Sequence, residues 1–119
     1  MRQRVVILAY PGVELLDVAG PANVLTAASR LLRGRGGYDV EIAASRAGPV
    51  ETAGGIGLVA KRGCGSLRPP IHTLVVPGGT DALGAGRGLL PVIGRLASGV
   101  SRVVGVCTGA FLLAEAGIL

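Results

Sequence analysis

Cys107 is the residue of this sequence best placed for covalent chemistry. It follows the β-branched run Val103–Val106 and precedes small and then apolar residues, so it fits neither a strand nor a helix interior. We therefore expect a sharp elbow that projects its sulfur at the carboxyl edge of a sheet. The amide groups of Thr108, Gly109 and Ala110 open the expected helix, whose positive end favours a thiolate over a thiol. Such an environment suits a nucleophile.

A structural interpretation of Cys107 stays open beside this one. Free cysteine is among the most buried residue types, and Val106–Gly109 also fits a packed strand end followed by a glycine turn. The residues around the cysteine do not decide between these two interpretations.

Asp17 is the second candidate for chemistry, as a general acid or base. It lies beyond a strand expected over Arg4–Tyr10, in a loop and helix entrance spanning Val13–Pro21. The spacing of apolar residues predicts a helix over Pro21–Leu32, with its proline in the first turn. Asp17 therefore either caps this helix or faces the site, and the two roles are compatible.

Gly78 and Gly79 form a third candidate segment, because they end a strand expected over His72–Pro77. Without side chains they let the backbone approach a ligand, and their amide groups can donate to developing negative charge. A tight strand-to-helix turn explains the same two glycines without a ligand.

The remaining chain alternates predicted strands and helices. The expected segments are a strand over Tyr38–Ser45, a hairpin within Val50–Val59, a polar loop or irregular helix over Lys61–Pro70, a flexible stretch over Gly84–Gly88, a helix over Leu89–Ala97 and a strand over Arg102–Val106. This order predicts a doubly wound α/β sandwich with a parallel sheet. Ligands of such sheets bind beyond the carboxyl ends of the strands, where Asp17, Gly78, Gly79 and Cys107 fall.

Composition limits the function classes. The 119 residues make one domain, and 50% hydrophobic and 3% aromatic residues with 21 glycines are typical of a parallel sheet covered by helices. A charged fraction of 16% excludes disorder. The net charge of +5 comes without a basic stripe carrying interleaved aromatics, so this segment is a poor candidate for nucleic-acid contact.

The other thiol and the histidine are predicted to be bystanders. Cys64 lies in a polar, glycine-rich stretch and is expected near solvent, while His72 starts a strand at the end away from the candidate site. No Cys or His spacing predicts a metal site or a disulfide, and we expect no cofactor. The short apolar N-terminal run is too short for a signal or a membrane span, so we expect a cytoplasmic protein with no membrane partner.

Three motifs in this order resemble the ThiJ/PfpI superfamily over essentially the whole chain. They are Tyr10–Gly12 with Leu16–Pro21, then Val76–Gly79, then Val106–Ala114. The resemblance implies a flavodoxin-like sandwich that often forms homodimers, in agreement with the predicted element order.

Within this superfamily two branches share the motifs. One is the amidase-like sensor domain of AraC-family transcriptional regulators, and the other is isonitrile hydratase, which hydrates an isocyanide to an N-substituted formamide. Residues Gly48–Ile56 and Val106–Leu119 are more similar to the regulators. The resemblance implies Cys107 as nucleophile, Asp17 as general acid/base and Thr108 as hydroxyl partner. We further expect Gly78, Gly79 and Gly109 to bind the ligand.

Two departures from the broader superfamily bear on function. Thr108 stands where protease-like and glyoxalase-like members have a histidine, which argues against a peptidase or deglycase activity. The chain ends at Leu119, so we expect a truncated N-terminal part whose sandwich, and any helix-turn-helix domain that contacts DNA, continue beyond it. The expected function is small-molecule sensing without turnover. The alternatives are the hydratase, an oxidant sensor acting through Cys107, and a degenerate domain that only dimerises.

Overall fold

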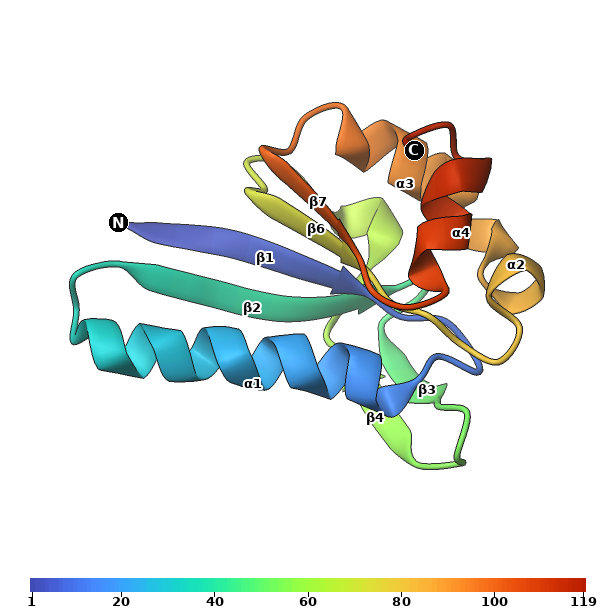
Figure 1. Cartoon of the computed structure of the whole chain (residues 1–119), viewed down its shortest axis with the longest axis horizontal. Coiled ribbons are helices and arrows are strands. Elements are labelled where there is room, and N and C mark those ends of the chain that lie inside the picture. The colour runs from blue at the N-terminus through green and yellow to red at the C-terminus, as the bar shows by residue number, and fades with distance from the viewer.

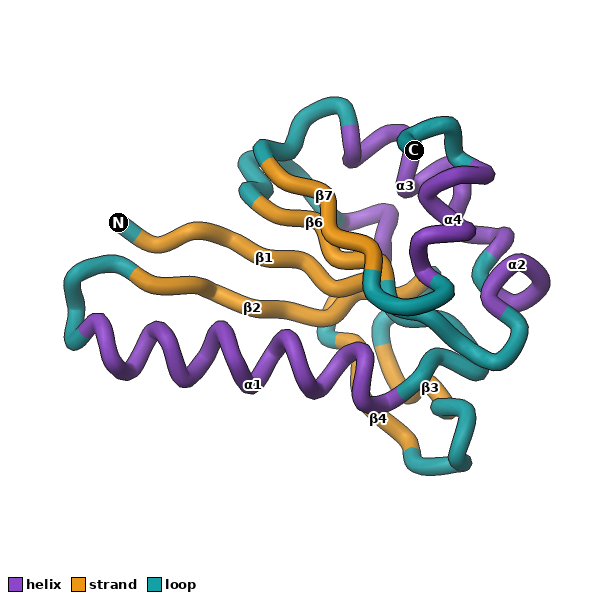
Figure 2. Tube along the Cα trace, viewed as in Figure 1, coloured by secondary structure: helices purple, strands orange, loops and turns teal.

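The computed structural model describes residues 1–119, which fold around a five-stranded parallel sheet flanked by helices (Figures 1 and 2). The strands run in the order β5-β2-β1-β6-β7, and every neighbouring pair is parallel. Their bounds are β1 Arg2–Leu8, β2 Gly37–Ala44, β5 Arg62–Gly63, β6 Thr73–Val76 and β7 Arg102–Gly105. The predicted α/β fold class is confirmed.

Strand β1 is the centre of the sheet because it is apolar on both faces. The side chains of Val5, Val6, Ile7 and Leu8 are fully buried, which requires cover on each side. Pairing with β2 and β6 places the carboxyl ends of all three strands at one edge of the sheet. The apolar sequence of β1 therefore makes it the central strand, and the candidate site residues follow the carboxyl ends of the strands.

Helices cover both faces of the sheet. Their bounds are α1 Leu15–Leu32, α2 Ala82–Ala85, α3 Leu90–Ala97 and α4 Gly109–Glu115, with 3₁₀ turns at Cys64–Ser66 and Arg87–Leu89. Leu25 of α1 shares a hollow with Val5 and Val75 on one face. On the opposite face, Gly105 of β7 lies against Leu113 of α4. None of the helices combines the length and the apolar character that crossing a membrane requires.

Helix α1 begins six residues earlier than the sequence predicted. It starts at Leu15, so Pro21 lies inside the helix and Asp17 lies in its first turn. A proline inside a helix removes one N–H donor, here the one that would bond the Asp17 carbonyl. The Glu14 amide is held on the Gly78 carbonyl at 2.9 Å, which fixes the direction of the chain where the helix begins. Of the two roles considered for Asp17, the helix cap is wrong, because Asp17 lies inside the helix.

The predicted hairpin is confirmed, but it does not form an edge of the main sheet. Strands β3 (Gly48–Glu51) and β4 (Gly57–Ala60) pair antiparallel as a separate two-stranded sheet. In Figure 1 this hairpin projects beside the start of α1. The Gly12 amide donates to the Glu51 carbonyl at 2.9 Å, so the hairpin braces the loop that leads into α1.

Two further segments differ from the local structure expected. Cys64 is only 2% exposed, because the polar segment around it folds back as a 3₁₀ turn over the core. Burial raises the pKa of this thiol, while the nearby charge of Arg95 acts in the opposite direction. The stretch Gly84–Gly88 is not irregular: it includes the end of α2 and the start of the 3₁₀ turn Arg87–Leu89. The Asp81 carboxylate caps the start of α2 by accepting from the Gly84 amide at 3.2 Å.

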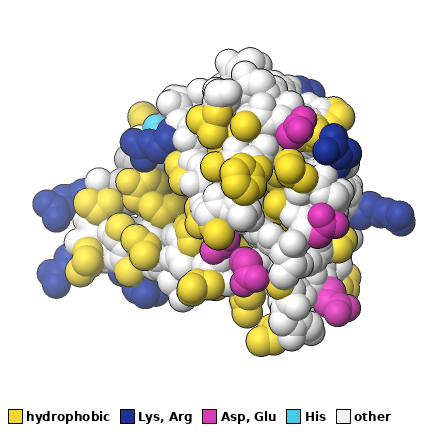
Figure 3. All heavy atoms as spheres, turned by 45° about the vertical axis from the view of Figure 1, so that its right-hand side comes forward, with side chains coloured by type: hydrophobic (Ala, Val, Ile, Leu, Met, Phe, Trp, Pro, Cys, Tyr) yellow, Lys and Arg dark blue, Asp and Glu magenta, His cyan; other side chains and the backbone are white.

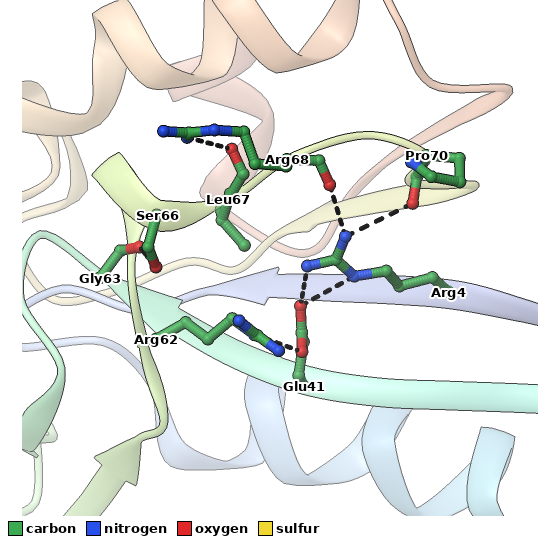
Figure 4. A network of polar contacts seen from close by, with 8 residues as sticks. All are labelled: Arg4, Glu41, Arg62, Gly63, Ser66, Leu67, Arg68 and Pro70. Carbon is green, nitrogen blue, oxygen red and sulfur yellow. Dashed lines mark hydrogen bonds and ion pairs between the residues drawn. The ribbon is translucent and has the colours of Figure 1, made fainter.

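A cluster of ionic side chains ties the edge strand β5 to the sheet (Figure 4). Glu41 of β2 accepts from the Arg4 Nη2 atom at 2.6 Å and from the Arg62 Nε atom at 3.0 Å. Arg4 also donates to the carbonyls of Arg68 and Pro70. Burial alone raises the pKa of Glu41, but the hydrogen bonds and charges of the two arginines outweigh it and lower the pKa.

Candidate functional site

The predicted elbow at Cys107 is present between β7 and α4. The Val106 amide donates to the Val76 carbonyl at 3.0 Å, so pairing between the strands continues to the residue before the cysteine. Cys107 then takes a φ of 53°, and its side chain is exposed. A non-glycine residue in the left-handed region costs on the order of 1 kcal/mol, and such strain persists where the surroundings impose it. The backbone thus presents the thiol at the carboxyl edge of the sheet.

Gly109 makes this tight elbow sterically feasible. A Cβ atom at this position would overlap the Val76 carbonyl oxygen, so only glycine lets α4 start so close to β6. The residue is buried, and its amide donates to the Val106 carbonyl at 2.9 Å. Its amide hydrogen is therefore already used inside the elbow. A contribution of Gly109 to ligand binding stays a prediction.

Asp17 and Thr108 reach the same short segment from two directions. The Gly78 amide donates to the Asp17 Oδ2 atom at 3.1 Å, and the Gly79 amide donates to the Thr108 Oγ1 atom at 3.1 Å. The Thr108 Oγ1 atom also lies 3.3 Å from the Gly79 carbonyl, to which the hydroxyl donates. The predicted residues Asp17, Gly78, Gly79 and Thr108 are therefore directly hydrogen-bonded, and Thr108 is the covalent neighbour of Cys107.

The absence of a side chain at Gly78 is essential to this arrangement. A Cβ atom there would lie 2.6 Å from the Thr108 Oγ1 atom, 2.8 Å from its amide nitrogen and 3.0 Å from the Asp17 Oδ2 atom. Gly78 thus occupies the space between the carboxylate and the hydroxyl. This contact explains the glycine better than a turn requirement does, because its φ is not positive.

Of the amide donors named from the sequence, only that of Thr108 is available. The amide hydrogens of Gly78 and Gly79 are used within the chain, as are those of Gly109 and Ala110. By contrast, the amides of Cys107 and Thr108 have no acceptor within the chain. These two adjacent donors beside the thiol can stabilise negative charge that develops on a bound molecule.

Tyr10 belongs to the same cluster, although sequence reasoning treated it only as the end of a strand and part of a motif. It is 2% exposed, and its hydroxyl donates to the Pro77 carbonyl at 2.7 Å. Burial, followed by the negative charges of Asp17 and Cys107, raises the pKa of Tyr10 far above its ordinary value. The signal available in the sequence was a polar aromatic residue directly after a fully buried strand.

The carboxyl edge carries negative charge that no ion pair neutralises. Of the seven acidic residues, Asp39 and Glu41 are paired with arginines, which leaves five unpaired. These five lie on loops, at helix ends and at the end of β3: Glu14, Asp17, Glu51, Asp81 and Glu115. Figure 3 shows acidic side chains among exposed hydrophobic ones on this side of the molecule. Beside Thr108, the unpaired Asp17 carboxylate favours neutral or cationic molecules over anions.

The site is an open surface, since none of the hollows in the structure includes Cys107. A shallow hollow of about 360 Å³ on the neighbouring surface is lined by Leu83, Phe111, Ala114 and Glu115. His72 takes no part in the site, as predicted, and its Nδ1 atom lies 2.7 Å from the Thr73 hydroxyl oxygen. No three His, Cys, Asp or Glu side chains gather closely enough to hold a metal ion.

Comparison with known proteins identifies relatives over the whole chain. The model of the DJ-1/PfpI family matches residues 3–119. An uncharacterized protein from the cpoL 5' region of Streptomyces lividans is 40% identical over 121 residues, covering 98% of this chain and 81% of that protein. An HTH-type transcriptional regulator of Mycobacterium tuberculosis is 44% identical over 52 residues, or 42% of this chain and 20% of the regulator.

Solved structures agree with these relatives. A ThiJ/PfpI family protein from Pseudomonas syringae superposes with a TM-score of 0.85 at 26% identity, covering all of this chain and 48% of that one. An AraC family transcriptional regulator from Pseudomonas putida superposes with a TM-score of 0.78 at 23% identity, covering 98% of this chain and 62% of that one. The chain therefore spans about half of the first solved structure and about three fifths of the second.

Proposed function

Because this chain belongs to the DJ-1/PfpI family, we propose that it is the small-molecule-sensing domain of a transcriptional regulator of the AraC type. In this proposal the edge around Cys107, Asp17 and Thr108 binds a metabolite without turning it over. A DNA-binding region would lie in polypeptide outside these 119 residues, and the protein would act in the cytoplasm.

One observation carries the proposal: the Cys107 thiol is exposed and hydrogen bonds hold the residues around it, but no histidine lies beside it to act as a base. Cys107 is exposed on a strained elbow, and Asp17 and Thr108 are held on consecutive amides. The single histidine, His72, lies at the other end of β6. A thiol held in place without a proton-transfer partner of this kind suits recognition better than acyl transfer.

The relatives support the regulatory part of the proposal. The mycobacterial HTH-type regulator shares 44% identity over 52 residues, and the Pseudomonas putida AraC-family regulator shares the fold. The unpaired acidic residues around the edge support a neutral or cationic ligand, such as an amine or an amino-acid derivative. Homodimer formation stays a prediction, which light scattering of the purified protein measures directly.

Binding and turnover are separated by one pair of assays on the same protein. Thermal unfolding is measured with a panel of amino-acid-derived and other nitrogenous metabolites, for the wild type and for Cys107→Ala. The proposal expects at least one metabolite to raise the melting temperature of the wild type, with a smaller or absent shift in Cys107→Ala. Failure of the whole panel to shift the wild type counts against the proposal.

The second assay tests the hydratase alternative with cyclohexyl isocyanide. In that reaction the Cys107 thiolate adds to the isocyanide carbon and the nitrogen and carbon take up protons. Water then displaces the thiolate to give N-cyclohexylformamide, so that one water is consumed per isocyanide. The proposal expects no more formamide from the wild type than from Cys107→Ala. Formamide that depends on Cys107 would establish the hydratase instead.

A further inference from the structure

The segment Pro77–Gly79 is the only direct connection between the Asp17 carboxylate and the Thr108 hydroxyl among the hydrogen bonds of the site. Asp17 accepts from Gly78, and Thr108 accepts from Gly79, each at 3.1 Å. Both bonds depend on where this segment lies, because glycine has wide backbone freedom and no side chain to anchor it. Backbone pairing with residues 12–14 holds part of the segment, since the Glu14 amide donates to the Gly78 carbonyl at 2.9 Å and the Thr80 amide donates to the Gly12 carbonyl at 3.2 Å. The Pro77 carbonyl takes no part in that pairing.

Tyr10 contacts this segment from the side opposite to Thr108. Its hydroxyl donates to the Pro77 carbonyl at 2.7 Å. A Cβ atom built on Gly79 would lie 3.0 Å from the Tyr10 Cε2 atom and 3.1 Å from its hydroxyl oxygen, so the ring packs directly on the glycine. A Cβ atom on Gly78 would instead meet Thr108 and Asp17. The segment is therefore held between the tyrosine ring and the two polar side chains.

We propose that Tyr10 is a positioning residue of this site: it fixes the Pro77 end of Pro77–Gly79 and thereby aligns the Gly78 and Gly79 amides on Asp17 and Thr108. The inference concerns the site to which the proposed function assigns ligand binding. The Tyr10 hydroxyl already donates to the Pro77 carbonyl and the residue is 2% exposed, so Tyr10 does not itself touch a ligand at the surface.

The chemistry of the phenol fits this role. A hydroxyl that holds a carbonyl has to keep its proton, and burial together with the charges of Asp17 and Cys107 keeps the pKa of Tyr10 high. Tyr10 therefore remains a donor over the whole pH range in which the protein is handled. A phenylalanine at this position would preserve the ring packing on Gly79 and remove only the bond to Pro77.

The test is amide hydrogen exchange, followed by NMR, in Tyr10→Phe. We expect the Gly78 and Gly79 amides to exchange about fivefold faster than in the wild type, the effect of losing one net hydrogen bond. Amides of Ile7 and Val75, in the centre of the sheet, should keep their rates. The matched control is Tyr38→Phe, which alters the other tyrosine of the chain and should leave Gly78 and Gly79 unchanged.

Unchanged exchange at Gly78 and Gly79 in Tyr10→Phe would overturn the proposal. An equal acceleration at Ile7 and Val75 would also overturn it, because Tyr10 would then act only on global stability. These readouts use no ligand, so they are independent of whether the domain senses a metabolite.

A second measurement covers the case in which Tyr10→Phe does not fold. In the Tyr38→Phe background, 3-fluorotyrosine replaces Tyr10 alone and keeps nearly the same shape, while its more acidic phenol is a stronger donor. We expect slower exchange at Gly78 and Gly79 in the labelled protein. Exchange at the unlabelled rate contradicts the role of the hydroxyl.

Discussion

Asp17 and Thr108, ninety-one positions apart in the chain, are held on two consecutive amide groups. The Asp17 carboxylate accepts from Gly78 and the Thr108 hydroxyl accepts from Gly79, each at 3.1 Å. The first residue comes from the start of α1 and the second from the elbow before α4. The segment after β6 therefore joins the two halves of the site. Cys107 lies in the same elbow as Thr108, one residue before it.

Gly78→Ala should damage the site while leaving the fold in place. The added Cβ atom would lie 2.6 Å from the Thr108 Oγ1 atom, so the hydroxyl, the carboxylate or the segment has to move. We expect a loss of about 1 to 3 kcal/mol in the free energy of unfolding, as for an overpacked site, and weaker ligand binding. Urea denaturation and the thermal-shift assay measure the two effects.

Gly94→Ala is the matched control for this substitution. Gly94 lies in α3, is exposed, and a Cβ atom there meets nothing within 4 Å. Since alanine is the better helix former, the variant should gain up to about 1 kcal/mol in stability without affecting binding. If Gly78→Ala behaves like Gly94→Ala, the close contact at Gly78 does not matter.

The strained backbone at Cys107 predicts a difference between two thiol-free variants. Alanine keeps the cost of a φ of 53°, whereas glycine adopts this conformation freely. Cys107→Gly should therefore be more stable than Cys107→Ala by about 1 kcal/mol in urea denaturation. Equal stabilities, or a less stable glycine variant, would show that the elbow stores no strain.

The unpaired acidic residues predict how Cys107 reacts with thiol reagents of different charge. Iodoacetamide is neutral and iodoacetate is anionic, so nearby acidic residues should slow the reaction with iodoacetate more than that with iodoacetamide. We expect the ratio of the iodoacetamide rate constant to the iodoacetate rate constant to be about threefold higher for Cys107 than for a free thiol. High salt should reduce this preference, because it screens exposed charges. Peptide mass spectrometry separates the exposed Cys107 from the buried Cys64. A rate ratio equal to that of glutathione at every salt concentration would contradict the local negative field.

The ion pairs of Glu41 predict a pH-dependent stability. The pKa of this carboxyl is lowered in the folded protein, so its contribution is present above the ordinary glutamate range and disappears as pH falls through the folded pKa. Glu41→Gln should be less stable than the wild type by about 1 kcal/mol at pH 7, with a smaller difference below about pH 4. Glu115→Gln, which removes an exposed and unpaired acid, should show no such loss. A constant deficit of Glu41→Gln at all pH values would exclude this explanation.

Much of the fold follows from local patterns in the sequence. The uninterrupted apolar run Val5–Leu8 predicted a central strand, and the run before Cys107 with the small residues after it predicted the elbow. The start of α1 was misplaced, because Pro21 favours a helix start when only propensity is considered. The structure overrides that preference through a tertiary contact, the bond between the Glu14 amide and the Gly78 carbonyl. Such contacts leave no trace in a single sequence.

The sequence predicted which residues make up the candidate site but not the hydrogen bonds between them. Asp17, Cys107 and Thr108 have recognisable neighbours, whereas the role of Tyr10 depends on β1 and β6 lying side by side. Cys64 was misplaced for a similar reason: its polar neighbours describe the local chain, but burial is decided by the segment folding back on the core. The sequence also could not show which amides are free to donate to a ligand: those of Gly78 and Gly79 were expected to be free, but they donate to Asp17 and Thr108.

We propose that this domain senses a small molecule for a DNA-binding protein. The most direct test titrates the native full-length gene product onto labelled DNA from upstream of its own gene, with and without a metabolite that stabilises the domain. We predict that the metabolite changes the dissociation constant at least tenfold, and that this response is lost in Cys107→Ala. A gene product that binds no DNA, or DNA binding that ignores every stabilising metabolite, would contradict the account.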